Sequence, residues 1–188
     1  EEKDAIVDFL TSGLFKGIGE KKAKAIVDVL GKDTLQIILE NPDNLILIPG
    51  ITKTNIDTLH NKLKEYESSY ETVLYLSNLG FSTKDSMLVY NTYKERVKEV
   101  IEEDIYQLEY SIYELNFKKI DRIALKNGLE RDAFVRIRAA ILYIMEEVSN
   151  TYGHSYFYYE EIFKYLPRVL LVNINDEAYQ KALDSLID

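Results

Sequence analysis

The residues best suited to bind a ligand lie in a glycine-containing loop near the N-terminus. Residues Leu14–Ala23 read LFKGIGEKKA, in which two apolar residues precede Gly-Ile-Gly and a small residue follows inside a predicted helix. Gly17 can adopt a positive φ that closes the turn, whereas Gly19 lets a ligand approach the backbone more closely than a Cβ would allow. The amides of Gly19, Glu20 and Lys21 then lie at a helix N-terminus, where unpaired N–H groups and the helix dipole favour a phosphate. We therefore expect phosphate binding, without chemistry on the ligand.

A second copy of this loop follows at Ile48–Thr52 and is again followed by a predicted helix. Gly50 stands 33 residues after Gly17, and Thr52 stands where the first loop has its second glycine. The Thr52 hydroxyl could itself donate a hydrogen bond to a phosphate. A repeated loop is more informative than one Gly-x-Gly turn, because tight turns use that pattern everywhere.

Two further copies are more degenerate. Leu79–Ser82 keeps one glycine and has Ser86 in the small-residue position, and Glu114–Phe117 follows 34 residues after Gly80 with no glycine. The nearly equal spacings within each half of the array suggest two paired hairpin units. The fourth loop is expected to pack rather than bind, unless the basic residues after it act instead.

The predicted backbone contacts to nucleic acid come first from the first two loops: Lys16, Gly17, Ile18, Gly19, Glu20, Lys21, Lys22, Lys24, Gly50, Ile51, Thr52 and Lys53. A second group comes from the degenerate copies: Gly80, Ser82, Lys84, Lys118, Lys119 and Arg122. For each loop the alternative is a purely structural hairpin, and for the basic residues it is a solvated helix face.

These loops require short helices to hold them. Apolar residues recur at helical spacing almost throughout, divided by glycine, proline, asparagine and serine. The longest helix is predicted over Arg131–Ser149, and strand candidates lie at 155–159 and 169–172. The predicted fold is mainly α, a tandem helix-hairpin-helix array followed by a small winged-helix-like or helical C-terminal cap. The expected segments are 1–67 and 68–129 for the two paired units, and 130–188 for the long helix and cap.

The charge of the chain is uneven. The 188 residues carry a net charge of −9, which argues against binding nucleic acid by bulk electrostatic attraction. Residues 1–64 contribute −1 and residues 65–188 contribute −8, but Asn116–Arg138 is locally +4. Tyrosines are abundant, and those at Tyr152, Tyr156, Tyr158 and Tyr159 could stack on unpaired bases or simply pack in the core.

Several classes of function are disfavoured by composition. The chain has no cysteine and only two histidines, His60 and His154, far apart in sequence, so no metal site is expected. No nucleophile–base arrangement stands out. No apolar run is long enough to cross a membrane and no signal pattern is present, so we expect a soluble, cytoplasmic protein. Because the sequence starts at Glu1 and stops just after a helical pattern, it is expected to be a piece of a longer protein.

The ordered set of motifs resembles the helix-hairpin-helix region of bacterial RecD-like DNA helicases, a family similar to the exodeoxyribonuclease V alpha subunit. The resemblance runs from about Leu14 to Leu166 through GIGEKKAKAIV, IPGITKTNIDTL, LYLSNLGFSTKDSMLVYNTY, NFKKIDRIALKNGL and IRAAILYIMEEVSNTYGHSYF. The first motif is shared with many DNA-repair proteins, whereas the ordered set with Gly153-His154 is more specific.

The resemblance implies an ATP-dependent motor that moves 5′ to 3′ on DNA in repair and recombination, with this region ahead of the motor. ATP and Mg²⁺ are then expected for the parent protein and no cofactor for this region, because no phosphate-loop motif exists and Gly31-Lys32 is followed by Asp33. The expected partners are DNA and the motor domains, with no membrane. Hairpin loops in related proteins can hold a monovalent cation through carbonyls, and the sequence leaves this open. The alternative is a structural or protein-interaction scaffold whose acidic surface contacts the motor or another protein.

Overall fold

The computed structural model describes residues 2–153 and 156–187, and within them it contains helices and no strand. The α-helices are α1 (Glu2–Leu10), α2 (Glu20–Leu30), α3 (Thr34–Glu40), α4 (Lys53–Glu65), α5 (Tyr70–Leu79), α6 (Thr83–Tyr93), α7 (Val97–Asp104), α8 (Gln107–Ser111), α9 (Phe117–Lys126), α10 (Phe134–Tyr152), α11 (Tyr159–Leu170) and α12 (Asp176–Asp184). Short 3₁₀ helices connect some of them: η1 (Gly31–Asp33), η2 (Pro42–Leu47) and η3 (Lys94–Arg96). The mainly α prediction is confirmed.

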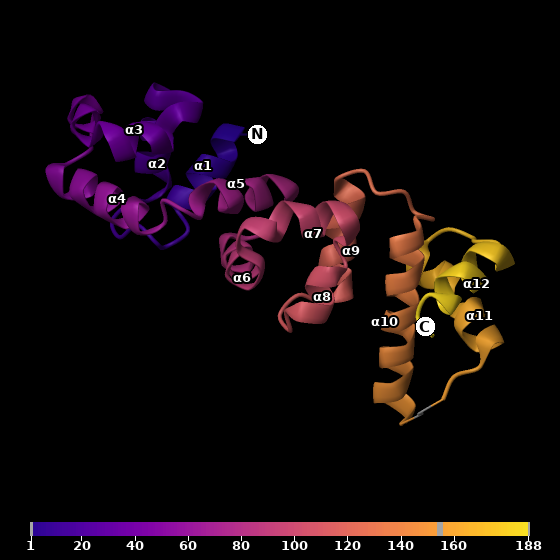
Figure 1. Cartoon of the computed structure of the whole chain (residues 1–188). Coiled ribbons are helices and arrows are strands. Elements are labelled where there is room, and N and C mark those ends of the chain that lie inside the picture. Colours follow the sequence, from indigo (N-terminus) through magenta and orange to yellow (C-terminus); the bar gives the residue numbers. More distant parts are fainter. Residues whose placement is uncertain (1, 154–155, 188) are drawn as a thin grey trace. The chain divides into compact units, whose positions relative to one another are not determined.

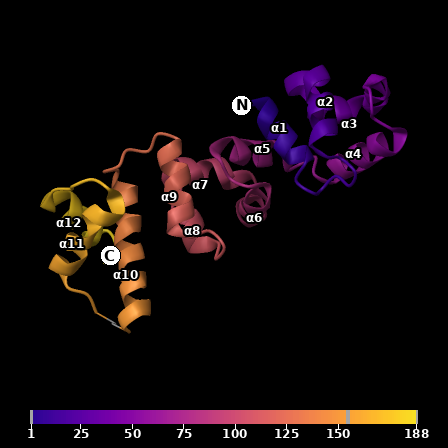
Figure 2. The same cartoon turned by 180° about the vertical axis from the view of Figure 1, so that it is seen from behind.

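The chain divides into two compact units, Glu1–Val97 and Lys98–Asp188. Within the first unit, α2, α3 and α4 lie together, and within the second α10 lies beside α11 and α12 (Figure 1 and Figure 2). The third hairpin, α5–α6, falls in the first unit and the fourth, α8–α9, in the second. The three segments expected from sequence stay a prediction.

The first unit is organised around a continuous apolar core that positions the first two loops. Phe9 of α1 packs against Phe15 of the first loop edge to face, with ring centroids 5.4 Å apart. Ile26, Ile38 and Leu59 bring α2, α3 and α4 into the same cluster, and each is fully buried. Burial of such side chains stabilises the fold by about 1.5–3 kcal/mol each.

The second unit is held by a buried ion pair in addition to apolar packing. Arg136 of α10 is only 1% exposed and donates from Nε and Nη2 to the two carboxylate oxygens of Asp121 in α9, at 2.8 and 3.0 Å. Its Nη1 donates to the carbonyls of Arg131 and Leu170, both at 2.7 Å, and the Tyr106 hydroxyl donates to Asp121 at 2.6 Å. One arginine thus joins α9, α10 and the end of α11.

The C-terminal cap is helical, so of the two predicted forms the winged-helix-like one is not observed. The strand expected over 169–172 is wrong, because its first two residues complete α11 and Leu171 adopts a positive φ of 55° that ends the helix. Residues 156–158 are irregular and α11 begins at Tyr159. His154 of the closing Gly-His element and Ser155 of the other strand candidate lie outside the described residues.

The longest helix is confirmed but begins three residues later than predicted. The Arg131 carbonyl accepts a hydrogen bond from the Arg136 guanidinium instead of from a helical amide. A turn therefore precedes Phe134, which is the first residue of α10. Among the described residues no helix has the length and apolar character needed to span a membrane.

Candidate nucleic-acid interface

All four predicted loops adopt one backbone pattern. An apolar residue at the middle of each loop is buried: Ile18, Ile51, Phe81 and Leu115. The residue after it is the N-cap of the following helix, in extended conformation: Gly19, Thr52, Ser82 and Asn116. Each N-cap carbonyl accepts from the amide four residues later, at 2.8–3.1 Å. The fourth copy, which lacks both glycines, therefore has the same geometry at the N-cap of its second helix.

The first glycine of the motif closes the turn as expected. Gly17 and Gly50 both have φ of +84°, and Gly80 has φ of +110°. This conformation is unfavourable for residues with a Cβ. In the fourth loop Glu114 takes this place without a positive φ, so that turn closes by another local conformation.

The second glycine, Gly19, is not required by the fold. Its φ is −93°, which any residue can adopt, and a Cβ built on it would have no neighbour within 4 Å. The absence of a side chain instead leaves the backbone open at the start of α2. This open surface is what a phosphate oxygen needs in order to reach the amides.

The N-cap side chain bonds to a backbone amide of its helix in three of the four loops, and in the first loop there is no such side chain. Thr52 Oγ1 accepts from the Asn55 amide at 3.2 Å, Ser82 Oγ from the Asp85 amide at 3.1 Å, and Asn116 Oδ1 from the Lys119 amide at 3.0 Å. Gly19 offers no such acceptor. Of the four described loops, the first therefore leaves more helix N-terminal amides available to an external acceptor than any other.

The first and second loops are joined through Asn55, which the sequence motifs did not indicate. The Lys22 ammonium donates to Asn55 Oδ1 at 3.0 Å, and the Asn55 side-chain nitrogen lies 3.7 Å from the position of a Cβ on Gly17. The Thr52 amide also donates to Asn55 Oδ1, at 3.1 Å. Asn55 stands 33 residues after Lys22, so the repeat spacing alone contained the signal that would have paired them.

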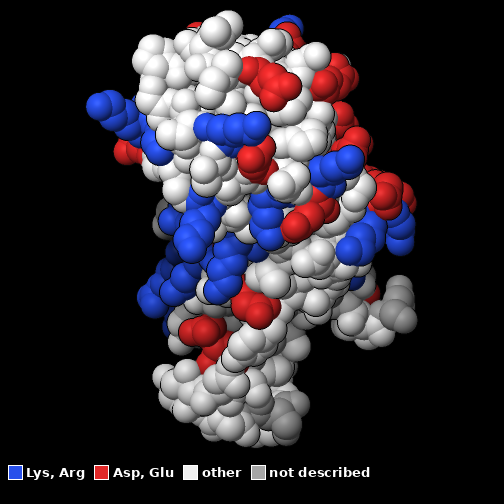
Figure 3. Space-filling view, turned by 90° about the vertical axis from the view of Figure 1, so that its left-hand side faces the viewer, with Lys and Arg blue, Asp and Glu red and all other residues white. Residues whose placement is uncertain are grey.

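The charged side chains around the first loop differ in availability. Lys16, Lys21 and Lys53 are exposed, whereas Lys22 is half-buried against Asn55. Lys24 pairs with Glu20, and their hydrogen bond raises the pKa of Lys24 and lowers that of Glu20. Figure 3 shows lysine and arginine side chains gathered on the face drawn, with aspartate and glutamate side chains beside and between them.

The remaining predicted contacts are distributed over two units. Gly80, Ser82 and Lys84 belong to the third hairpin, and Lys118, Lys119 and Arg122 lie on α9. The two groups therefore belong to different units.

Within the basic segment 116–138 the interpretation as a solvated helix face fails for Arg136, because this side chain is buried and paired with Asp121. Lys118 and Arg122 remain exposed. Among residues 2–153 and 156–187 no group of histidine, aspartate or glutamate side chains is arranged to hold a metal ion.

Residues 65–156 match the family model described as the ATP-dependent RecD2 DNA helicase HHH domain. The matched segment includes the third and fourth loops, and the first and second loops precede it. No solved structure matched the chain.

Proposed function

We propose that the chain binds the DNA backbone without sequence preference through its first hairpin loop, and the match of residues 65–156 to the RecD2 DNA helicase HHH domain supports this proposal. The amides of Gly19, Glu20 and Lys21 at the start of α2 hold a phosphate. The module positions DNA for a motor and carries out no chemistry of its own.

The observation that carries this proposal is the open N-terminus of α2. A glycine occupies the N-cap although the backbone there would accept any residue and a Cβ would have space. A side chain such as serine or asparagine would cap and stabilise the helix, typically by about 0.5–2 kcal/mol relative to alanine. A glycine at this N-cap gives up that stabilisation and leaves the amides accessible to a ligand.

The second loop extends the surface beside the first. Lys53 and the hydroxyl of Thr52 are exposed, and the Lys22–Asn55 hydrogen bond holds the two loops together. Two loops side by side supply contacts to successive phosphates. Such contacts carry no sequence information, and their strength should fall steeply with salt because each one releases condensed counterions.

The substitution Gly19→Asp tests the proposal. Aspartate would cap α2 and place a negative charge where the phosphate binds, so we expect DNA affinity to fall about tenfold or more while the fold is kept. Fluorescence anisotropy with labelled single-stranded, duplex and 5′-tailed DNA across a salt series measures this loss.

Asn61→Asp is the matched control, because it adds the same charge at an exposed position in α4 away from the loop. Circular dichroism should give the same helix content for both variants. Equal affinities of the Gly19→Asp and Asn61→Asp proteins would remove the first loop from the interface.

A second function is favoured by the charge of the later part of the chain. Residues 65–188 carry −8 of the net charge, which suits a scaffold that contacts motor domains or another protein. Salt separates the two functions, since phosphate binding weakens steeply with salt and an apolar protein interface does not. The parent activity in either case is an ATP- and Mg²⁺-dependent 5′ to 3′ helicase.

A further inference from the structure

A groove in the second unit joins α9, α10 and α11. Three neighbouring hollows of ≈ 160, 290 and 490 Å³ form it. The first two share Ile144 and Tyr165 in their walls, and the second and third share Tyr143 and Arg168. The largest has the volume of an ordinary small-ligand site, about 300–1,000 Å³, and together the hollows extend well beyond it.

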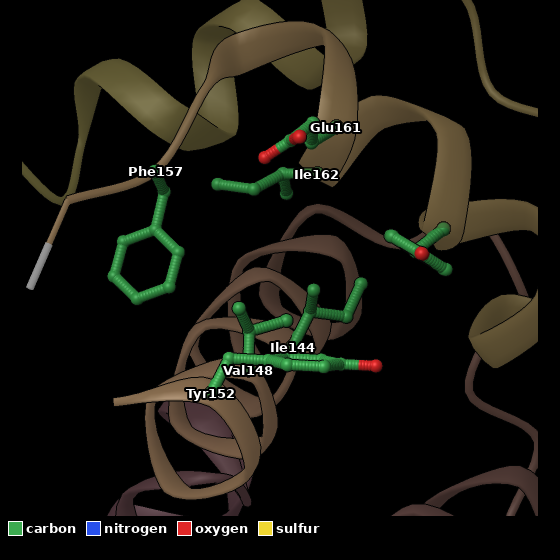
Figure 4. A pocket seen from close by; sticks show the side chains of 7 residues that line it. Ile144, Val148, Tyr152, Phe157, Glu161 and Ile162 are labelled. Carbon is green, nitrogen blue, oxygen red and sulfur yellow. The ribbon is translucent and has the colours of Figure 1, made fainter. Parts of the chain in front are cut away.

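The end of the groove away from α9 is lined by apolar and aromatic side chains. Figure 4 shows Ile144, Val148 and Tyr152 on α10 facing Phe157 and Ile162 across the hollow. Tyr152 is 70% exposed. The floor of this hollow is therefore apolar, and a large aromatic ring lies open to solvent at its edge.

Two more tyrosines continue this aromatic wall toward α9. Tyr165 of α11 is 45% exposed and lines both of the smaller hollows. Tyr143 of α10 lines the two larger hollows and stacks on Phe117 with ring centroids 4.8 Å apart and planes 16° from parallel. The stacking fixes the Tyr143 ring, which reduces the entropy that a ligand would have to remove on binding.

Cations gather at the α9 end. Lys118, Arg122 and Arg168 line the largest hollow together with one acid, Asp121. Both Asp121 oxygens are engaged by Arg136, so its charge is already compensated. Lys118 lies 6.0 Å above the Tyr143 ring and Arg168 lies 5.7 Å above the Tyr165 ring, and neither forms an ion pair within the described part of the chain. The acids Glu147 and Glu161 line the other two hollows.

We propose that this groove binds single-stranded DNA, with phosphates at Lys118, Arg122 and Arg168 and bases against the rings of Tyr143, Tyr152 and Tyr165. The proposal rests on the proposed function, because it presupposes that the chain binds DNA. Aromatic rings beside a cationic track are the combination that holds single strands without sequence preference. A duplex cannot use them, because its bases are already stacked and paired.

Other occupants fit the groove less well. A free nucleotide would fill one hollow and leave the aromatic wall beyond it unused. An apolar protein segment would cover Arg122 and Arg168 without supplying a counter-charge, which is costly for a buried cation. A phosphodiester chain supplies both the charge and the successive rings.

The test compares two double variants that lose the same charge from the same helices. Arg122→Ala/Arg168→Ala removes two groove cations, and Lys126→Ala/Lys164→Ala removes two exposed lysines of α9 and α11 that do not line the groove. Anisotropy with a labelled oligo(dT) strand should show about tenfold weaker binding for the groove variant than for its control. Tyr165→Ala should weaken the same complex about fivefold or more, as expected for one lost base stack.

The binding of duplex DNA separates this proposal from the proposed function. The groove variants should keep the duplex affinity of the unaltered chain, whereas Gly19→Asp should lose it. Photo-crosslinking of a 5-iodouracil strand, mapped by mass spectrometry, should label tyrosines of α10 or α11, and a thermal melt checks that each variant is folded.

Equal single-strand affinities for the groove and control variants would overturn the groove proposal and leave a protein segment as its occupant. If duplex binding still depended on Gly19, the proposed function would stand without the groove. A chain that binds no form of DNA would contradict both proposals.

Discussion

The loop before α2 and the loop before α9 close with the same backbone hydrogen bonds, yet they leave different atoms exposed. At the first loop Gly19 provides no side chain, so the amides at the start of α2 face outward. At the fourth, Asn116 accepts from the Lys119 amide, and the Glu109 carboxylate accepts a hydrogen bond from the Phe117 amide. The chain itself occupies the positions that a phosphate would take.

The cations near the two loops differ in part, because Lys118 and Arg122 beside the fourth loop are exposed whereas a third cation there is not. Lys16 and Lys21 extend into solvent beside the first loop. Near the fourth, Arg136 is buried in a bidentate pair with Asp121. A repeated backbone therefore leaves different groups available to a ligand, because the two helix N-termini differ in whether a side chain already satisfies them. Four predictions test this contrast.

The largest effect is expected from Arg136→Met. Loss of the guanidinium leaves the Asp121 carboxylate half-buried without its partner, and removing one member of a buried pair typically costs about 3–5 kcal/mol. Chemical denaturation followed by circular dichroism measures the free energy of unfolding. Arg131→Met, which removes an exposed charge from the same segment, should change it little. Similar stabilities for the two variants would show that Arg136 is not a structural cation.

Glu109→Gln should alter the pH dependence of stability. Burial, with a smaller effect of Glu146, raises the pKa of the Glu109 carboxyl to about 7, above its ordinary value of 4.5. The folded chain then holds this proton more tightly than the unfolded chain, so the unfolding free energy should fall as the pH rises from about 4.5 to about 7 and then stay level.

The side-chain amide of the Glu109→Gln variant does not titrate. At pH 8 its unfolding free energy should therefore exceed that of the unaltered chain by about 1–3 kcal/mol, and near pH 4 the two free energies should be equal. Urea denaturation at a series of pH values gives this difference. Glu147→Gln, at an exposed position of α10, is the control. A constant difference at every pH would mean that Glu109 does not titrate in this range.

Gly19→Asn would give the first loop the N-cap of the fourth. The amide oxygen should accept from the Lys22 amide as Asn116 accepts from Lys119, and DNA affinity should fall about tenfold for one lost hydrogen bond to a charged group. Gly19→Ala adds a Cβ but cannot cap, so its loss should be smaller. If alanine and asparagine weakened binding equally, steric access rather than capping would decide affinity.

The smallest effect is expected from Asn116→Gly, the reverse exchange. Stability should fall by only a few tenths of a kcal/mol, because glycine is a tolerable N-cap. DNA affinity should not change, since Glu109 still occupies the Phe117 amide. An affinity that rose severalfold would identify the fourth loop as a second phosphate site.

Much of the fold followed from local patterns in the sequence. Helical spacing and glycine punctuation were sufficient for the mainly α class, for the hairpins and for the long helix near Phe134–Tyr152. The failure at 169–172 has a clear physical source. A short run of branched apolar residues is compatible with a strand or with the buried end of a helix. Here Leu170 packs in the core as the last residue of α11, so the run continues the helix.

The candidate site could be located but not completed from sequence. The motif indicated which amides face outward, because glycine positions and helix starts are local. The role of Asn55 depends on Lys22, 33 residues away, and only a comparison of equivalent repeat positions would have paired the two. The role of Arg136 depends on Asp121, 15 residues away, and no pattern in the sequence pairs these residues. The groove of the second unit was equally hidden, since its walls come from three separate helices.

The Lys22–Asn55 contact has a consequence for how such an array can diverge. The two residues stand at equivalent positions of the first and second repeats, three residues after Gly19 and Thr52. Two identical repeats would place lysine against lysine there, or asparagine against asparagine, and the former pair would repel. The contact between the first and second hairpins therefore requires two different residues. A chain rebuilt from identical consensus repeats would lose the Lys22–Asn55 hydrogen bond, however well each copy folded alone.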